Sequence, residues 1–182
     1  MGLFSKKVKI PEMHNVIWMN SLVKRSNSVK FVVEHPGAII LAWFPATKEI
    51  FDQLFNVEKG MNVEIKMANT ISSIMVEGKT IIFLEHYPIY EKERDLILNW
   101  NVKQIFVLNA LDEPLFRLFG SERIVGLMER LGMKEEDQIK HPMVDKSIMR
   151  AQQKLAQKKV VDHRVQSIEE WFKRSINPLD NL

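Results

Sequence analysis

Four short runs, each about as long as a β-strand, constrain the fold more than any other feature of this sequence. The clearest is Ala38 to Phe44, AIILAWF, which has no polar residue and therefore suits a strand covered on both faces. Two patterns of helical spacing, Thr47 to Phe55 and Tyr90 to Leu98, lie between runs. Strands joined by helical crossovers pair in parallel, so the sequence predicts an α/β fold: a small, mostly parallel sheet with helices on both faces. The other three runs are Asn62 to Met67, Thr80 to Leu84 and Lys103 to Leu108.

The segment before Ala38 is predicted to be a tail followed by a helix. Pro11 suits the first turn of a helix, and apolar residues recur near helical spacing from Met13 to Val23. The polar stretch Ser26 to Ser28 is expected to interrupt this helix. The tip, Met1 to Lys9, combines a few apolar residues with three lysines and is expected to fray, without a stable membrane anchor. Peripheral contact with a membrane stays open.

The last third of the chain is predicted to be helical and to end in a long helix. Gly120 and Ser121 mark the end of one helix and the start of the next. From Val144 to Ser175 there is no Pro and no Gly. A continuous helix of this length would extend roughly 45 to 50 Å, more than the width of a small domain. The second half of this helix should therefore project and bury its stripe of apolar residues against a partner or another copy of the chain. The expected contact stripe is Val161, Val165, Ile168, Trp171 and Phe172.

Composition excludes several classes of function. The 26 basic and 23 acidic residues are interleaved and give a net charge of +3, which lacks the clustered cationic stripe of a nucleic-acid-binding protein. The absence of Cys excludes disulfides and thiolate chemistry. No apolar run is long enough to span a bilayer. We therefore expect a cytoplasmic protein that does not bind nucleic acid.

One short sequence partly matches the motif of a phosphate-binding loop. Gly78-Lys79-Thr80 matches the end of that motif, but Ser73 stands where its first glycine is required. The bulky residues Ile74 to Val76 would fill the loop, and a strand rather than a helix follows, so a plain turn is predicted. The stretch Ile71 to Val76 fits either the end of a helix or the first strand of a hairpin with Thr80 to Leu84, and periodicity leaves both open.

Polar side chains follow two of the predicted strands and form the best candidate binding edge. These residues are Glu85, His86, Asn109 and Asp112. Open α/β sheets bind ligands at the carboxyl ends of their strands, and a carboxylate with an imidazole could perform acid–base chemistry there. However, no nucleophile or Gly-rich loop accompanies them, and the five histidines lack zinc-ligand spacing. We therefore predict no catalytic residue, no metal and no cofactor.

The segment Leu111 to Gln166 resembles the preprotein translocase ATPase SecA. In that family the second nucleotide-binding fold continues into a helical scaffold through a stretch close to LEDDLMRIFGSERI, a helix ending in RLGM, and IEHPMVTKSIENAQKKVE. The matching residues here are Leu111-Asp112-Glu113, Leu115, Arg117, Phe119 to Ile124, Arg130 to Met133, Ile139, His141 to Val144, Lys146 to Ile148, Ala151-Gln152, Lys154, Asp162, Arg164, Gln166 and Glu169.

The resemblance implies a RecA-like half-domain without its catalytic parts. It suggests a tail and helix in residues 1–37, the half-domain in 38–120 and a scaffold-like extension in 121–182. The family's G-R-G-T-D motif, its arginine-finger segment and its phosphate loop have no counterpart in this sequence. Phosphoryl transfer depends on the charges that these motifs hold around the phosphate. The resemblance therefore implies a protein that does not hydrolyse ATP.

Two hypotheses of different classes follow. The first is a non-catalytic, SecA-related interaction module, accessory to protein export, which binds a protein partner or forms a homo-oligomer through the contact stripe. The alternative is a binding protein or an enzyme that takes a nucleotide or small molecule at the edge near Glu85, His86 and Asp112.

Overall fold

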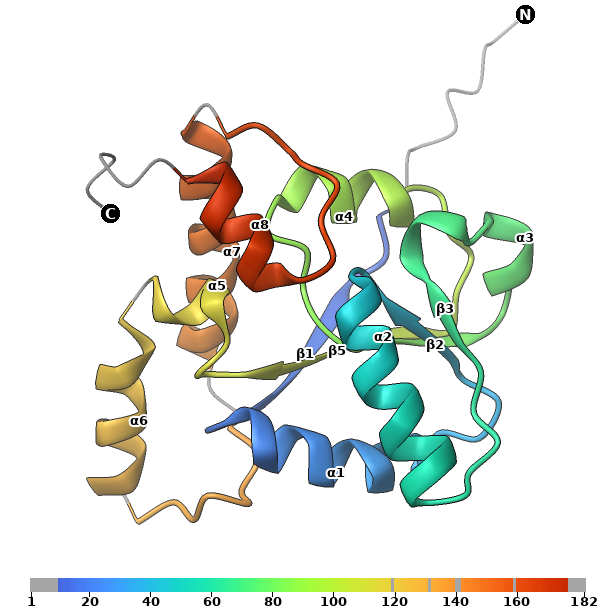
Figure 1. Ribbon diagram of the computed structural model, residues 1–182, viewed down its shortest axis with the longest axis horizontal. Coiled ribbons are helices and arrows are strands. Elements are labelled where there is room, and N and C mark those ends of the chain that lie inside the picture. The colour runs from blue at the N-terminus through green and yellow to red at the C-terminus, as the bar shows by residue number, and fades with distance from the viewer. Residues whose placement is uncertain (1–9, 119, 131, 140–141, 159, 177–182) are drawn as a thin grey trace, which may run out of the picture.

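The computed structural model describes residues 10–118, 120–130, 132–139, 142–158 and 160–176. A five-stranded sheet forms its centre, and all neighbouring strands run parallel in the order β1-β5-β4-β2-β3 (Figure 1). The predicted α/β class is confirmed, and the architecture is that of a small RecA-like fold. The strands are β1 (Met13–Trp18), β2 (Ile39–Ala42), β3 (Ile65–Met67), β4 (Thr80–Phe83) and β5 (Gln104–Ala110).

Helices cover both faces of the sheet, as predicted. Alternating side chains of each strand point to opposite faces: Ile82 packs with Phe55 on the face of α1 and α2, whereas Ile81 packs with Ile97 on the face of α3 and α4. The helices are α1 (Ser21–Glu34), α2 (Pro45–Asp52, continued by a π-helical turn at Gln53–Glu58), α3 (Ser73–Val76), α4 (Tyr90–Ile97), α5 (Pro114–Arg117), α6 (Ser121–Arg130), α7 (Pro142–Gln157) and α8 (Ile168–Ser175), with a 3₁₀ turn at Ala68–Thr70.

The helix predicted between Pro11 and Val23 is wrong, because Met13–Trp18 forms the edge strand β1. β1 pairs with β5, and Val16 lies opposite Leu108. The chain becomes helical only after Asn20, whose Oδ1 accepts a hydrogen bond from Val23 N at 2.9 Å. This N-cap places the helical turn after the strand.

The interruption expected between Ser26 and Ser28 is also absent, since α1 continues to Glu34. Ser28 Oγ donates to Arg25 O at 2.7 Å, and the side chain is fully buried. A hydroxyl that bonds to the carbonyl one turn earlier satisfies its own polar group without ending the helix. The stretch between Ile71 and Val76 ends in the single helical turn α3, not in a hairpin strand. The tip Met1 to Lys9 lies outside the described residues, as does His141.

The stretch from Val144 to Ser175, which has no Pro and no Gly, forms two helices instead of one long helix. α7 ends at Gln157 and α8 begins after Ser167, whose Oγ accepts a hydrogen bond from Glu170 N at 3.2 Å. Between them the chain turns, so that α8 contacts α5 and shares an apolar cluster with α7 (Figure 1). We call residues 160–176, which include α8, the return segment. Because of this turn, the described residues contain no helix of the predicted length.

Besides the apolar residues on the two faces of the sheet, a third apolar cluster lies at its carboxyl edge, next to the helices coloured yellow to red in Figure 1. We call it the edge cluster. It joins residues that follow strands, such as Phe44 and Leu111, to buried residues of α7 and the return segment, such as Ile148 and Trp171. Trp171 is 0% exposed. The SecA-like part of the chain therefore covers the edge at which folds of this kind hold their ligands.

Candidate functional site at the carboxyl edge of the sheet

The chain moves from β2 outward to β3 and then returns past β2 to β4, so the carboxyl ends of β2 and β4 form the switch point of the sheet. The Glu85 carboxylate, just after β4, lies there at the N-terminus of α2. Its Oε1 accepts hydrogen bonds from Trp43 N and Phe44 N, both at 3.1 Å, and its Oε2 accepts one from Thr47 Oγ1 at 2.5 Å. Backbone amides at a helix N-terminus form an anion-binding position, and here the anion is a side chain of the protein itself.

The return segment contributes a further acceptor to the same helix end. Gln166 O accepts a hydrogen bond from Ala46 N, in the first turn of α2, at 3.0 Å. Three of the backbone donors at this N-terminus are therefore bonded to acceptors of the chain. A phosphate could bind there only by displacing both Glu85 and the return segment.

Burial raises the pKa of the Glu85 carboxyl to about 7. Loss of hydration is the largest cause, and it outweighs the Thr47 hydrogen bond and the charge of Lys24, which both favour the ionised form. Lys24, on α1, is itself buried and forms an ion pair with Glu113 at the start of α5. Since Glu113 already neutralises the lysine, Glu85 has no cation to itself.

His86, the next residue, belongs to a separate buried network. Its Nδ1 is 2.9 Å from Glu93 Oε1, and its Nε2 is 2.7 Å from Asn15 Oδ1. Asn109 Nδ2 donates to Val107 O at 2.9 Å and also to Asn15 Oδ1 at 3.0 Å, which fixes the orientation of both amides. Asn15 Oδ1 therefore acts as an acceptor, so Nε2 of His86 carries a hydrogen, and Nδ1 faces a carboxylate. Both ring nitrogens are engaged within the protein.

This network also fastens α7 to the sheet. Gln152 Nε2 donates to Glu93 Oε2 and to Tyr87 O, each at 2.8 Å. Tyr87 N donates to Glu93 Oε1 at 2.6 Å. Gln152 and Glu93 are both almost completely buried, so the loss of either partner would leave polar atoms unsatisfied.

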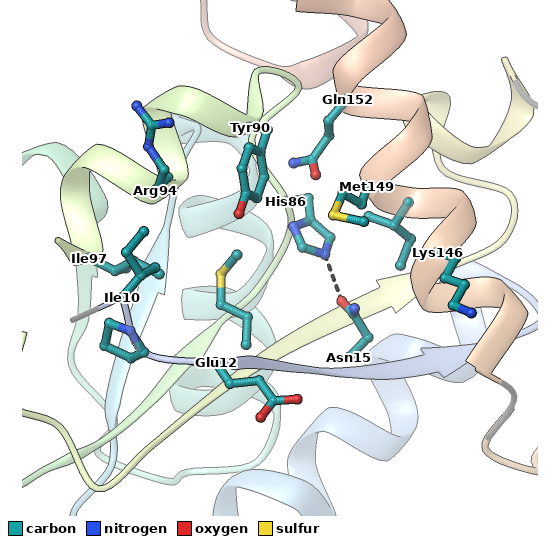
Figure 2. A pocket seen from close by; sticks show the side chains of 13 residues that line it. Ile10, Glu12, Asn15, His86, Tyr90, Arg94, Ile97, Lys146, Met149 and Gln152 are labelled. Atoms are coloured by element: carbon teal, nitrogen blue, oxygen red, sulfur yellow. Dashed lines mark hydrogen bonds between the residues drawn. The ribbon is translucent and has the colours of Figure 1, made fainter. Parts of the chain in front are cut away.

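A pocket of about 410 Å³ opens next to this network, between β1, α4 and α7 (Figure 2). Much of its lining is apolar, and Met149 is 42% exposed. Figure 2 shows the Tyr90 hydroxyl directed toward the pocket and the charged ends of Arg94 and Lys146 on its rim. Both nitrogens of His86 are already bonded, so this imidazole is not available to a ligand as a general base. Its chemistry suits a small, largely apolar ligand.

The four residues predicted to form one binding edge do not form one site. All four follow or end strands at the carboxyl edge, but Glu85 bonds to α2, whereas His86 and Asn109 meet at Asn15. Asp112, which follows β5, reaches the first residue of α1, where its Oδ1 accepts a hydrogen bond from Ser21 Oγ at 2.6 Å. Each side chain serves a different contact between elements.

The predicted contact stripe is mostly covered by the chain's own edge cluster. The side chains of Val165, Ile168 and Trp171 are buried, and Phe172 is partly buried against them. Only Val161 is well exposed, at 62%. The stripe was expected to need a partner chain because the long helix was expected to project. Instead the chain turns before α8, and the stripe packs against apolar residues at the edge of the chain's own sheet.

Asp162 holds the return segment against the loop after β4. Its Oδ1 accepts from the Tyr87 hydroxyl and from Trp171 Nε1, the latter at 2.9 Å, and its Oδ2 lies 2.9 Å from Lys92 Nζ. Burial alone would raise the pKa of Asp162, but the hydrogen bonds from Tyr87, Trp171 and Lys92 outweigh it and lower that pKa. Burial, followed by the Asp162 contact, raises the pKa of the Tyr87 phenol.

Sequence reasoning missed three members of these networks: Asn15, Glu93 and Gln152. Asn15 was assigned to a helix and so was not placed at a strand edge. Gln152 carried a readable signal, because it lies on the same face of α7 as the buried Ile148 and Leu155. A polar residue on an apolar helix face indicates a buried hydrogen bond.

Within the described residues, no group of three or more His, Asp or Glu side chains is arranged to hold a metal ion. The same part of the chain contains no helix with the length and apolarity needed to traverse a bilayer.

The fold and the edge together define a class: a small α/β protein of RecA-like architecture whose carboxyl edge is closed by its own C-terminal segment. No protein-family profile matches the chain. However, 46 residues, 25% of the chain, are 59% identical to the protein translocase subunit SecA of Acidithiobacillus ferrooxidans, and 51 residues, 28% of the chain, are 59% identical to SecA of Anaeromyxobacter sp. strain Fw109-5. SecA of Prosthecochloris aestuarii is also 59% identical over 46 residues.

The chain therefore carries a SecA-derived segment, which confirms the resemblance. These matches cover only 4% to 5% of the length of the SecA proteins concerned. The similarity indicates an origin related to protein export.

Proposed function

We propose that this chain is a non-catalytic, SecA-derived interaction module that acts in the cytoplasm as an accessory to protein export. The observation that carries the proposal is the occupied N-terminus of α2. Glu85 and the carbonyl of Gln166 accept the hydrogen bonds that a bound phosphate would need there. A chain that fills this position with its own acceptors gains no stability from a nucleotide.

The SecA-like segment supports the interaction part of the proposal. Its residues build α5, α6 and α7 and the first half of the return segment, and these elements form the outer layer over the sheet edge. In this proposal the segment contributes an outer surface for binding and no catalytic groups. We propose that this surface binds a protein partner or a second copy of the chain.

The nucleotide part is tested by thermal unfolding with Mg-ATP or Mg-ADP and by phosphate release. We expect no change in the unfolding midpoint and no hydrolysis above buffer. If the protein bound a nucleotide, a nucleotide concentration of about 100 times the Kd would raise the free energy of unfolding by about 2.7 kcal/mol, which is easily detected. A nucleotide-dependent rise in the midpoint that disappears in Thr47→Val would overturn the non-catalytic proposal.

The interaction part is tested by sedimentation velocity and by affinity capture from native lysate. We expect either concentration-dependent self-association or enrichment of components of the export machinery. A strict monomer that enriches no such component would contradict it.

The pocket beside His86 favours a second candidate function, the binding of a small apolar molecule. Met149→Trp would fill the pocket from α7, where the side chain is already partly exposed. A compound that stabilises the wild-type protein but not this variant would support the second function. Equal stabilisation of both proteins would place the compound elsewhere.

A further inference from the structure

A groove apart from the Glu85 and His86 networks lies between the start of α1, α5 and α6. We call it the α6 groove, and its volume is about 460 Å³. Its floor is apolar and is formed by Met19, Leu111 and Val125, of which the first two are buried. An apolar floor that side chains of several elements surround is suited to receive an apolar side chain of a partner.

The ends of α6 explain why the groove exists. Gly120 and Gly132 have φ values of +76° and +80°, which only glycine adopts readily, so the chain turns sharply on both sides of the helix. α6 thus lies at the side of the protein next to α5 (Figure 1). Its side chains Ser121 and Val125 line the groove.

The rim of the groove is acidic, although the chain as a whole has a net charge of +3. Asp112, Glu129 and Glu135 contribute three negative charges, and Arg117 contributes one positive charge, so the lining has a net charge of −2. Glu129 and Glu135 are exposed and come from α6 and from the connection that follows it. No described side chain forms an ion pair with either of them.

We propose that the α6 groove binds a partner peptide in which Lys or Arg residues flank an apolar side chain. The apolar side chain would enter between Met19, Leu111 and Val125, and the flanking cations would lie beside Glu129 and Glu135. Charge complementarity selects this class of peptide, because an acidic rim repels an acidic segment and attracts a basic one. The inference rests on the proposed function, since it names the surface through which the interaction module acts.

The test uses fluorescence anisotropy with a labelled probe peptide, acetyl-Lys-Lys-Leu-Phe-Leu-Lys-amide, and a counterpart in which Glu replaces each Lys. We expect the wild-type protein to bind the Lys probe and not the Glu probe. We also expect binding to weaken when salt is raised from about 50 mM to about 300 mM, because exposed charges are screened.

The decisive variant is the double substitution Glu129→Lys and Glu135→Lys. Reversing two rim charges replaces two attractions with two repulsions, so we expect the Kd for the Lys probe to rise about tenfold or more. Both positions are exposed, and a Lys in the last turn of α6 suits the helix C-terminus, so the fold should persist. The control is Glu58→Lys with Glu77→Lys, which changes the net charge equally at exposed sites away from the groove.

The outcomes separate the groove from the proposed function. Equal Kd values for the two double variants, or equal binding of the two probes, would overturn the groove proposal even if export proteins are captured from lysate. Probe binding that only the groove variant loses would support the groove, and would do so even if the wild-type protein captured no export component.

Discussion

Glu85→Gln tests whether burial raises the pKa of the carboxyl at the start of α2. Gln has nearly the same shape, its oxygen can accept from Trp43 N and Phe44 N, and its amide can donate to the Thr47 hydroxyl. The substitution therefore removes the titration and retains most of the contacts.

The magnitude follows from the pKa of this carboxyl. The folded value of about 7 lies about 2.5 pH units above the ordinary value of 4.5. Between these values the folded protein holds a proton that the unfolded chain has released, so the free energy of unfolding falls as pH rises. At about 1.4 kcal/mol per pH unit, the wild-type protein loses about 3 kcal/mol by about pH 8, and the loss is absent near pH 4.5. Glu85→Gln should not show this loss.

The assay is urea unfolding followed by circular dichroism at about pH 5, 6, 7 and 8. We expect the stability of Glu85→Gln relative to wild type to increase by about 2.5 kcal/mol across this range, because part of the loss has already occurred at pH 5. Glu77→Gln, at an exposed position, controls for general effects of removing a carboxylate. A constant difference between Glu85→Gln and wild type would show that the α2 amides and Lys24 hold Glu85 ionised, and it would refute our reasoning.

Two further predictions concern the return segment. Trp171→Ala should lower the free energy of unfolding by about 3 to 5 kcal/mol, because it empties a fully buried site, whereas Val161→Ala at an exposed position should change it by less than about 0.5 kcal/mol. Equal effects in urea unfolding would mean that the return segment is not packed as described. Asp162→Asn should lower the pKa of the Tyr87 phenol toward that of an ordinary tyrosine, because it removes a neighbouring negative charge. Absorbance titration measures this change, with Tyr87→Phe isolating the signal of Tyr90, and an unchanged titration would contradict the Asp162 contact.

The parallel sheet was predictable because two of its central strands lie in almost wholly apolar runs. Ala38 to Phe44 and Thr80 to Leu84 have few other ways to bury every side chain, so their assignment to strands did not depend on distant contacts. The edge strand β1 differs, since only its second half is buried. Three apolar residues at helical spacing then suggested a helix, and pairing with β5 decided for a strand.

The break between α7 and α8 was partly visible in the sequence. Ser167 followed by Glu170 is the signature of a helix start, and the polar pair Lys158-Lys159 stands in the sequence between the apolar residues of α7 and those of the return segment. The return of α8 to the sheet was not visible, because the sequence shows that an apolar stripe needs a partner and not which surface provides it. The position of Glu85 at the start of α2 likewise depends on strand order, which the sequence alone did not fix.

The closed edge of the sheet has a consequence for how a protein of this kind can acquire new functions. An open parallel sheet offers ready-made ligand contacts at one rim, and new specificities usually arise there by changes in loops. In this chain α7 and the return segment occupy that rim. Selection for recognition can therefore act freely only on the outward sides of the helices that cover it.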